Sequence, residues 1–412
     1  MKELTRDSRL LFATRTARLF GYGFLSVVLV LYLTELGLTE GQVGLLLTLT
    51  LIGDTAISLW ITTHADRIGR KRMLIAGAGL MILAGLLFVA TNNYFLLVLA
   101  ATIGVISPSG NEVGPFLSIE QAALSHLLPD NRRTGVFAWY NLVGSFATAL
   151  GALSGGGLSQ ILRSSGMPAL EAYRFVVVGY ALIGLLLAIM FLGLGPAVET
   201  LSRVKPEASS EAKPNTFLGL GRSRAIVFRL AALFSLDAFA GGFVISSLVA
   251  YWFHVRFGAE PGVLGAIFFG ANILAGISAL SAAWVARRIG LIRTMVFTHL
   301  PSNVLLMLVP LMPNLPLAIV VFLLRFSISQ MDVPTRQSYT MAMVEPEERS
   351  AASGVTGVAR TIGASLAPIF TGILFSNPAL LSLPFLISGS LKIVYDVILY
   401  RSFQAHRPPE EK

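Results

Sequence analysis

Four polar side chains in an apolar stretch near the C-terminal end share one face of a helix. They follow one another at i, i+4, i+7 and i+11 and are Arg325, Ser329, Asp332 and Arg336. Asp332 and Arg336 are one turn apart, so we expect them to pair. Pro334 removes a backbone hydrogen bond and predicts a bend. Because this face has two arginines and one aspartate, one positive charge is left unbalanced, and an acidic partner or an anionic ligand would neutralise it.

A second cluster lies in the stretch ISPSGNEVGPFLSIEQAAL, residues 106–124. Its prolines and glycines predict a broken helix, which a membrane tolerates only where the backbone faces protein or water. Its polar groups include Asn111, Glu112 and Glu120. When the two halves of the chain are aligned, Glu112 matches Asp332 and Glu120 matches Arg336. We therefore expect these four charged groups at one central site, with a structural network that fixes helix packing as the alternative.

Other ionisable residues inside apolar stretches are functional candidates by default, because a charge in hydrocarbon is costly. Arg18 and Asp237 occupy matching positions in the two halves, and we expect an ion pair between them that acts as a gate or a proton-sensitive site. The alternative is that Arg18 reaches the membrane surface. Arg360 matches Asn141 and is expected to face a cavity, and Asp54 is placed where it could titrate.

Three further polar residues have a plainer interpretation. Lys392 and Asp396 are one helical turn apart, and their spacing predicts that they neutralise each other. His299 is interpreted as a hydrogen-bonded helix residue, with a proton relay as the less favoured alternative.

The elements that carry these residues are expected to be membrane helices. The chain has 412 residues, of which 54% are hydrophobic and only 13% are charged, about half the charge of a soluble domain. Apolar stretches long enough to cross about 30 Å of hydrocarbon recur along it. The fold class predicted is an all-α membrane protein with twelve transmembrane helices in two pseudo-symmetric six-helix bundles. The expected spans are 10–33, 42–63, 73–91, 94–126, 134–162, 172–194, 226–253, 262–286, 292–312, 316–343, 350–375 and 380–401.

The distribution of positive charge predicts the orientation. Most of the 31 Lys and Arg residues lie at the termini and in alternate gaps. The opposite set of gaps holds Arg163, Arg174 and Arg256. By the positive-inside rule both termini face the cytoplasm, in a plasma (inner) membrane that the chain crosses many times. The same scatter of cations argues against a nucleic-acid partner, and the absence of cysteine excludes disulfides and thiolate metal sites.

An internal repeat divides the chain. Residues 195–225 are polar and contain three prolines, and they are interpreted as a cytoplasmic linker between bundles at 1–194 and 226–412. HADRIGRKRM at 64–73 aligns with VARRIGLIRT at 285–294. Parallel six-helix repeats imply two bundles related by an axis along the membrane normal.

The segment ADRIGRKR resembles the signature between spans 2 and 3 of the major facilitator superfamily. The matching residues are Asp66, Arg67, Gly69, Arg70 and Lys71, whereas the leading glycine of that signature is Thr62 here. The resemblance implies a transporter that works by alternating access, with two bundles that rock about a central site. It also implies that Asp66 lies near the start of span 11 and holds a gate, with a local ion pair to Arg70 as the alternative.

Together these features predict a secondary active transporter of a small-molecule substrate, coupled to H⁺ through Glu112, Asp237 or Asp332 first, and Glu120 or Asp54 next. Proton-coupled antiport that exports a small amphipathic compound is favoured, with modest support from the glycine-rich stretch 144–157. Transport of a small organic or inorganic anion is the alternative, argued from Arg18, Arg325, Arg336 and Arg360. The third hypothesis is that the protein is a receptor or scaffold that does not transport a solute. No phosphate loop, HExxH motif or activated nucleophile indicates an enzyme, and we expect no metal, no cofactor, a monomer and a lipid bilayer as surroundings.

Overall fold

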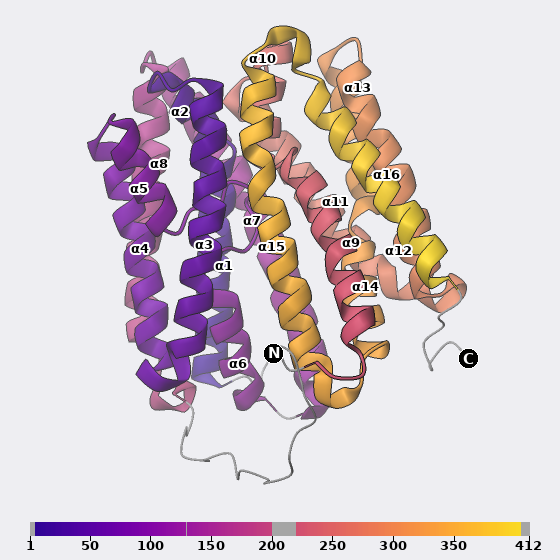
Figure 1. Ribbon diagram of the computed structural model, residues 1–412. Coiled ribbons are helices and arrows are strands. Elements are labelled where there is room, and N and C mark those ends of the chain that lie inside the picture. Colours follow the sequence, from indigo (N-terminus) through magenta and orange to yellow (C-terminus); the bar gives the residue numbers. More distant parts are fainter. Residues whose placement is uncertain (1–4, 129, 200–219, 405–412) are drawn as a thin grey trace. The chain divides into compact units, whose positions relative to one another are not determined.

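The computed structural model describes residues 5–128, 130–199 and 220–404, which form long helices joined by short turns (Figure 1). The longer helices of the first half are α1 Arg6–Ser26, α2 Leu29–Glu35, α3 Glu40–Ile68, α4 Arg70–Ala90, α5 Tyr94–Ile103, α6 Phe116–Leu127, α7 Asp130–Ser164 and α8 Ala169–Leu192. Those of the second half are α9 Arg224–Gly242, α10 Ser246–Phe257, α11 Pro261–Ile289, α12 Leu291–Leu308, α13 Leu315–Ser329, α14 Asp332–Ala342, α15 Arg349–Phe375 and α16 Leu383–Phe403.

Among the described residues, ten helical segments are long and apolar enough to cross a membrane, and the bent pair α1 and α2 makes an eleventh. The remaining predicted span, 94–126, is divided between α5 and α6, and each piece is shorter than a membrane crossing. The prediction of an all-helical membrane protein is confirmed.

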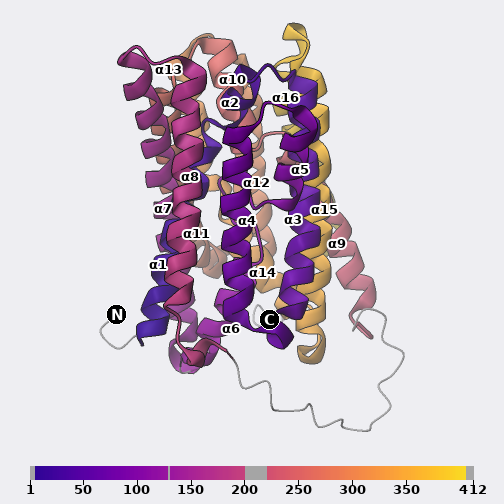
Figure 2. The same ribbon diagram turned by 90° about the vertical axis from the view of Figure 1, so that its left-hand side faces the viewer.

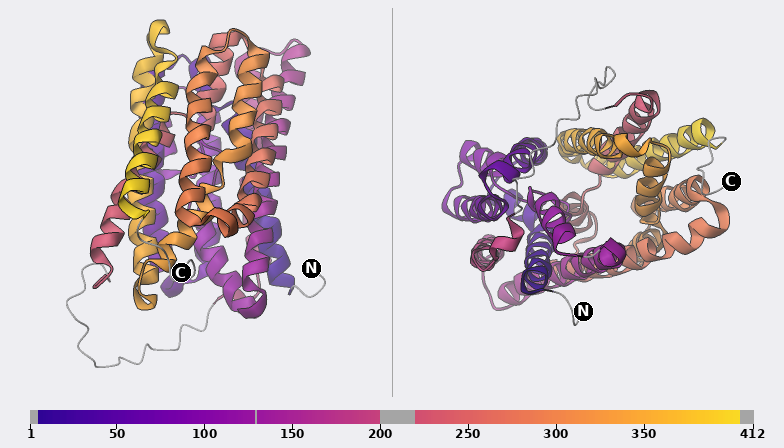
Figure 3. Two further views of the ribbon diagram at one scale, coloured as in Figure 1. Left: turned by 90° about the vertical axis from the view of Figure 1, so that its right-hand side faces the viewer. Right: turned by 90° about the horizontal axis from the view of Figure 1, so that it is seen from below.

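Two of the predicted spans are interrupted where prolines and glycines stand. Between α5 and α6 the chain is irregular from 104 to 115, and Gly110 and Gly114 adopt positive φ angles of 70° and 81° (Figure 2). Span 10 breaks at residues 330–331, between α13 and α14, in the orange part of the chain in Figure 3. Pro334 has no N–H to bond the carbonyl of Gln330, so the break falls four residues before the proline. Both predicted interruptions are confirmed.

The aligned turns of the repeat have related geometry. Gly69 joins α3 to α4 with φ of 114°, and Gly290 joins α11 to α12 with φ of 87°. Only glycine adopts such angles readily, so each reversal of the chain depends on the glycine that the sequence alignment pairs.

Glycines also let matching helices approach closely within each half. A Cβ atom on Gly151 of α7 would collide with the carbonyl oxygen of Phe20 in α1, and one on Gly155 would collide with that of Phe24. In the second half, Gly363 of α15 lies in the same way against the carbonyl oxygen of Ser235 in α9. Close packing of α1 on α7 therefore explains the glycine-rich stretch 144–157, and α9 packs on α15 in the same way.

The contacts divide the chain into two compact units. Unit 1 comprises Met1–Ala208 with Ser246–Phe269, and unit 2 comprises Ser209–Ile245 with Gly270–Lys412. Within unit 1, α10 is held by the hydroxyl of Ser246, which donates to the carbonyl of Ser109 at 2.8 Å, and by Tyr251, whose hydroxyl donates to Glu40 at 2.8 Å. The domain boundaries at 195 and 225 stay a prediction.

Candidate functional site

Unit 1 contains a buried ionic network built by α1, α6, α7 and the irregular segment before α6. Arg18 is fully buried, and its two terminal nitrogens donate to both oxygens of Glu120 at 2.8 and 2.7 Å. Its Nε donates to Glu112 at 2.8 Å. Arg15, one turn earlier on α1, donates to Glu112 at 2.9 Å and to the side-chain oxygen of Asn141 at 3.2 Å. Two arginines therefore face two carboxylates, and the network is balanced in charge.

Neutral donors complete this network. The hydroxyls of Thr14 and Tyr140 both donate to the Glu120 carboxylate, the first at 2.8 Å. The guanidinium of Arg15 lies over the ring of Tyr140, 4.3 Å from its centroid. Glu120 thus accepts bonds on both oxygens from three side chains, as a carboxylate needs when it is removed from water.

Asp54 of α3 has different surroundings. It is buried, and its carboxylate accepts bonds from the backbone N–H of Gly114 at 2.7 Å and from Ser58 at 3.4 Å. Among the described residues no cation lies within ion-pair distance of it. Asp54 therefore fastens the irregular segment between α5 and α6 to α3. Asn111, in that segment, is exposed.

Unit 2 contains a second network, centred on Asp237 of α9. The Nζ of Lys392 in α16 lies 2.5 Å from one Asp237 oxygen. The other oxygen receives Arg336 of α14 at 3.2 Å and Arg360 of α15 at 3.4 Å. Arg336 also pairs with Asp332 at 2.9 Å, as the sequence predicted. Arg360 differs from its neighbours because 34% of its side chain is exposed, against 5–9% for the other four.

A dyad of His299 and Asp396 adjoins the second network. The Nδ1 of His299 in α12 lies 2.8 Å from one oxygen of Asp396 in α16, and Asn303 donates to the other oxygen at 2.9 Å. The Nε2 of His299 faces Asp237 at 3.8 Å. The dyad thus connects α12 and α16 to the carboxylate at the centre of the network.

Among the charges inside the helices around Asp237, the central charges of unit 2, cations outnumber carboxylates. The cations are Arg325, Arg336, Arg360 and Lys392, and the carboxylates are Asp237, Asp332 and Asp396. Arg325 lies over the ring of Phe326, 4.9 Å from its centroid. Its buried Nε has no hydrogen-bond partner among the residues that the structure describes. Arg325 and Arg360 are therefore the least satisfied of these four cations.

One pairing expected from the sequence is wrong. Lys392 and Asp396 were expected to neutralise each other, but Lys392 reaches Asp237 and Asp396 holds His299. Here partners on neighbouring helices take the place of the one suggested by spacing along the helix. Arg18 and Asp237 each have partners within their own unit, and an ion pair between them stays a prediction.

The predicted gating motif forms local contacts in unit 1. The side chain of Asp66, 63% exposed, pairs with Arg70 at 2.9 Å, which was the alternative to a gate. The Nζ of Lys71 donates to the carbonyls of Leu192 and Leu194 at the end of α8, both at 2.8 Å. Arg67 is exposed. A gating role for this motif stays a prediction.

Each unit also has a helix start that is capped by a glutamate from elsewhere in the chain. Glu199 accepts the backbone N–H groups of Arg70 and Lys71 at the start of α4, at 2.8 and 3.1 Å. Glu348 accepts those of Gly221, Arg222 and Ser223 before α9, at 2.9 to 3.0 Å. Partial burial opposes ionisation of Glu348, but these N–H donors prevail and lower its pKa.

Comparison with known proteins identifies the family. The sequence profile of the Major Facilitator Superfamily matches residues 11–368 and again 257–412. The chain therefore belongs to this superfamily of secondary transporters, which are not enzymes, and it is a multi-pass membrane protein with a small-molecule substrate.

Similar proteins support the same conclusion. An uncharacterized membrane protein of Saccharomyces cerevisiae, YJR124C, is 33% identical over 421 residues, covering 96% of this chain and 93% of the yeast protein. The Quinolone resistance protein NorA of Staphylococcus aureus is 26% identical over 141 residues, 34% of this chain and 35% of NorA. In fold, the chain resembles the nucleoside transporter NupG (TM-score 0.72, 14% identity, 97% and 100% coverage) and a D-xylose-proton symporter (0.73, 16%, 98% and 98%).

Proposed function

We propose that the protein transports a small anion together with H⁺, and that the anion binds at Arg360. The observation that carries this proposal is the excess of cations over carboxylates among the central charges of unit 2. A buried cation without an opposite charge is costly, and an anionic ligand would supply that charge. Guanidinium groups suit carboxylates and phosphates in particular, because their planar N–H donors match two oxygens at once.

The geometry of Arg360 supports its role in binding. A guanidinium has five N–H donors, whereas Arg360 makes a single carboxylate contact within the described part of the chain. At 3.4 Å it is the longest of those between Asp237 and Arg or Lys. It is also the most exposed member of the network. Arg360 therefore has donors to offer a ligand without losing a short internal bond. The sequence alone favoured efflux of an amphipathic compound; the charges of unit 2 reverse that order.

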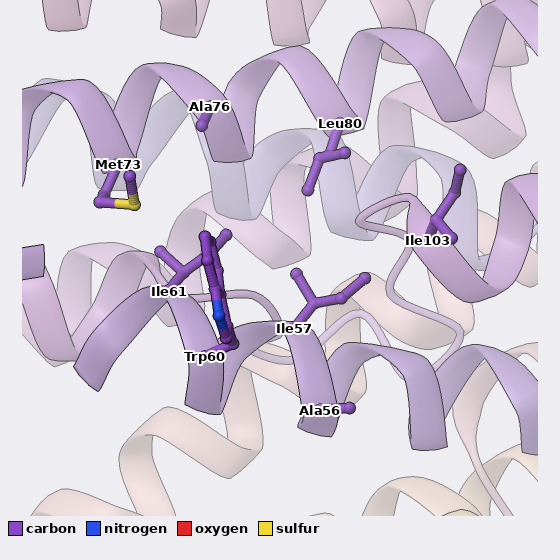
Figure 4. A pocket seen from close by; sticks show the side chains of 8 residues that line it. All are labelled: Ala56, Ile57, Trp60, Ile61, Met73, Ala76, Leu80 and Ile103. Atoms are coloured by element: carbon purple, nitrogen blue, oxygen red, sulfur yellow. The ribbon is translucent and has the colours of Figure 1, made fainter. Parts of the chain in front are cut away.

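Efflux of a small amphipathic compound stays the second candidate, and an apolar groove in unit 1 favours it. The groove has a volume of about 470 Å³ and lies between α3, α4 and the end of α5 (Figure 4). Trp60 and Ile57 of α3 and Leu80 of α4 are among its lining side chains. The partial similarity to a quinolone resistance protein points the same way.

The remaining expectations complete the proposal. Both termini would face the cytoplasm of a plasma membrane, the chain would work as a monomer, and two six-helix bundles joined by the linker 195–225 would carry the substrate by alternating access. Asp66, Arg67, Gly69, Arg70 and Lys71 would form the gate. The contact of Lys71 with the end of α8 supports a role for this motif in holding the cytoplasmic end of unit 1 together.

Transport in proteoliposomes tests the proposal. The purified full chain is reconstituted and offered labelled phosphate, gluconate, succinate and ethidium, with and without a pH gradient. We expect uptake of at least one anion, strengthened by an inward proton gradient and abolished by Arg360→Gln. Arg401→Gln, an exposed arginine of α16 in the same unit, is the matched control and should transport as wild type does. Movement of ethidium that is indifferent to Arg360→Gln would favour efflux instead.

A further inference from the structure

We propose that His299 carries the coupling proton, and that Asp396 and Asn303 position its ring to receive that proton at Nε2. The inference rests on the proposed function, since a coupling proton presupposes transport. It assigns the proton to a residue for which the sequence favoured a purely structural role, instead of to one of the carboxylates expected from the sequence.

In this proposal Asp396 is ionised, and its charge decides which nitrogen of His299 is free. Nδ1 lies 2.8 Å from a carboxylate oxygen of Asp396. An ionised carboxylate only accepts, so Nδ1 carries the hydrogen of the neutral ring. The amide nitrogen of Asn303 lies 3.2 Å from Nδ1 and donates to the second Asp396 oxygen at 2.9 Å, which holds that carboxylate in place. Nε2 is therefore the nitrogen without a hydrogen, and it points toward Asp237 at 3.8 Å.

Charged and titratable groups surround His299 directly or through Asp237. Asp237 of α9 and Tyr395 and Asp396 of α16 lie against the ring itself. Arg336 of α14, Arg360 of α15 and Lys392 of α16 bind Asp237, and Asp332 binds Arg336. Arg325 of α13 interacts electrostatically with Asp237 and Asp332. Of these, Asp396 and Asp237 are the carboxylates within 4 Å of the ring nitrogens. Both stabilise the imidazolium that a proton on Nε2 would create.

Protonation of His299 would release Arg360. The imidazolium adds a cation beside Asp237, which already holds three. Lys392 is bound at 2.5 Å, and Arg336 is also bound to Asp332. Arg360 has Asp237 as its one carboxylate contact among the described residues, at 3.4 Å. Arg360 is therefore the cation that loses its contact with Asp237 most readily, and it becomes free to bind the anion.

The sign of the coupling follows from the charges. With a neutral His299 the four cations and three carboxylates around Asp237 leave one positive charge, and the proton makes it two. An anion binds more tightly to the protonated site, and by linkage a bound anion raises the affinity for the proton. Proton and anion therefore bind together and travel in the same direction. A cationic substrate would instead expel the proton.

Infrared pH-difference spectra of the full chain in lipid test the proton site without any ligand. Between spectra recorded at acidic and at alkaline pH we expect a change in imidazolium bands that is absent in His299→Gln. The bands should also change in Asp396→Asn, which removes the carboxylate partner. His254→Gln is the control, because His254 bonds the carbonyl of Ala259 in unit 1, outside this network. Carboxylic-acid bands that vanish in Asp54→Asn or Asp396→Asn, with no contribution from His299, would overturn the proposal.

A transport measurement separates this inference from the proposed function. One pH unit corresponds to about 1.4 kcal/mol per proton, or about tenfold accumulation of a co-transported solute. Wild type should accumulate labelled gluconate or phosphate to this extent, and His299→Gln should lose the response to the gradient. If wild type moves no anion while the imidazolium bands are present, the proposed function fails and the proton site stands. If His299→Gln responds to the gradient as wild type does, the proton site fails and the function stands.

Discussion

Glu120 is the residue whose loss should show most clearly that the unit 1 network stabilises the fold. Arg18 is fully buried and bonds both oxygens of Glu120, and the hydroxyls of Thr14 and Tyr140 bond the same carboxylate. Glu120→Gln keeps the shape of the side chain but removes its charge. Arg18 is then left with Glu112, which it shares with Arg15.

The expected cost follows from the chemistry of buried pairs. Breaking one by removal of a single partner costs about 3–5 kcal/mol, because the other charge remains buried. Glu112 still compensates Arg18 in part, so we expect about 3 kcal/mol for Glu120→Gln. For a chain of this size this corresponds to a fall in melting temperature of about 3–4 °C. Arg18→Met should cost at least as much, since it leaves Glu120 buried without its cation.

The double variant distinguishes a charge effect from simple loss of packing. Arg18→Met with Glu120→Met leaves Arg15 and Glu112 as a balanced pair, so the double variant should be more stable than either single variant. The assay is thermal unfolding of the purified full chain, followed by loss of the monodisperse peak in size-exclusion chromatography. The reasoning would be refuted if the falls in melting temperature of the two single variants added up in the double variant, or if Glu120→Gln melted at the same temperature as wild type.

Three further predictions concern other parts of the molecule. Arg360→Lys keeps the charge but loses the planar donors, and we expect it to weaken anion uptake about tenfold, measured as a rise in KM; unchanged KM would contradict this. The folded-state pKa of Glu348 is below its ordinary value of 4.5, so the stability that its charge contributes is present above pH 4.5 and is lost as the pH falls below that value. The difference in stability between wild type and Glu348→Gln should therefore shrink in acid, and a difference that does not change with pH would argue against the cap. Gly151→Leu places a side chain against Phe20 of α1 and should prevent folding, whereas Gly157→Leu, with open space around it, should not; equal yields of folded protein would refute close packing.

The helices could be predicted from the sequence because their signals are local. Apolar length and the prolines and glycines at 108–115 and 334 gave the spans and their breaks. Gly69 and Gly290, aligned by the repeat, occur at turns with positive φ in both halves. Each of these features depends on residues close together in the chain.

The partners of buried charges could not be predicted in the same way. Spacing along one helix suggested that Lys392 binds Asp396, but residues on other helices compete for both, and Asp237 and His299 lie closer. Arg15 was not among the predicted site residues although it stands one turn before Arg18, and this position was a usable signal. For His299 no local signal existed, because its two carboxylates come from α9 and α16.

Proton uptake upon anion binding tests the central claim most directly. Gluconate or succinate is added to the purified full chain in a weakly buffered solution near pH 7, and the pH is followed. We predict that the protein takes up protons as either anion binds, and that His299→Gln and Arg360→Gln abolish the uptake. Release of protons, or no change in pH with any anion of the panel, would contradict the account.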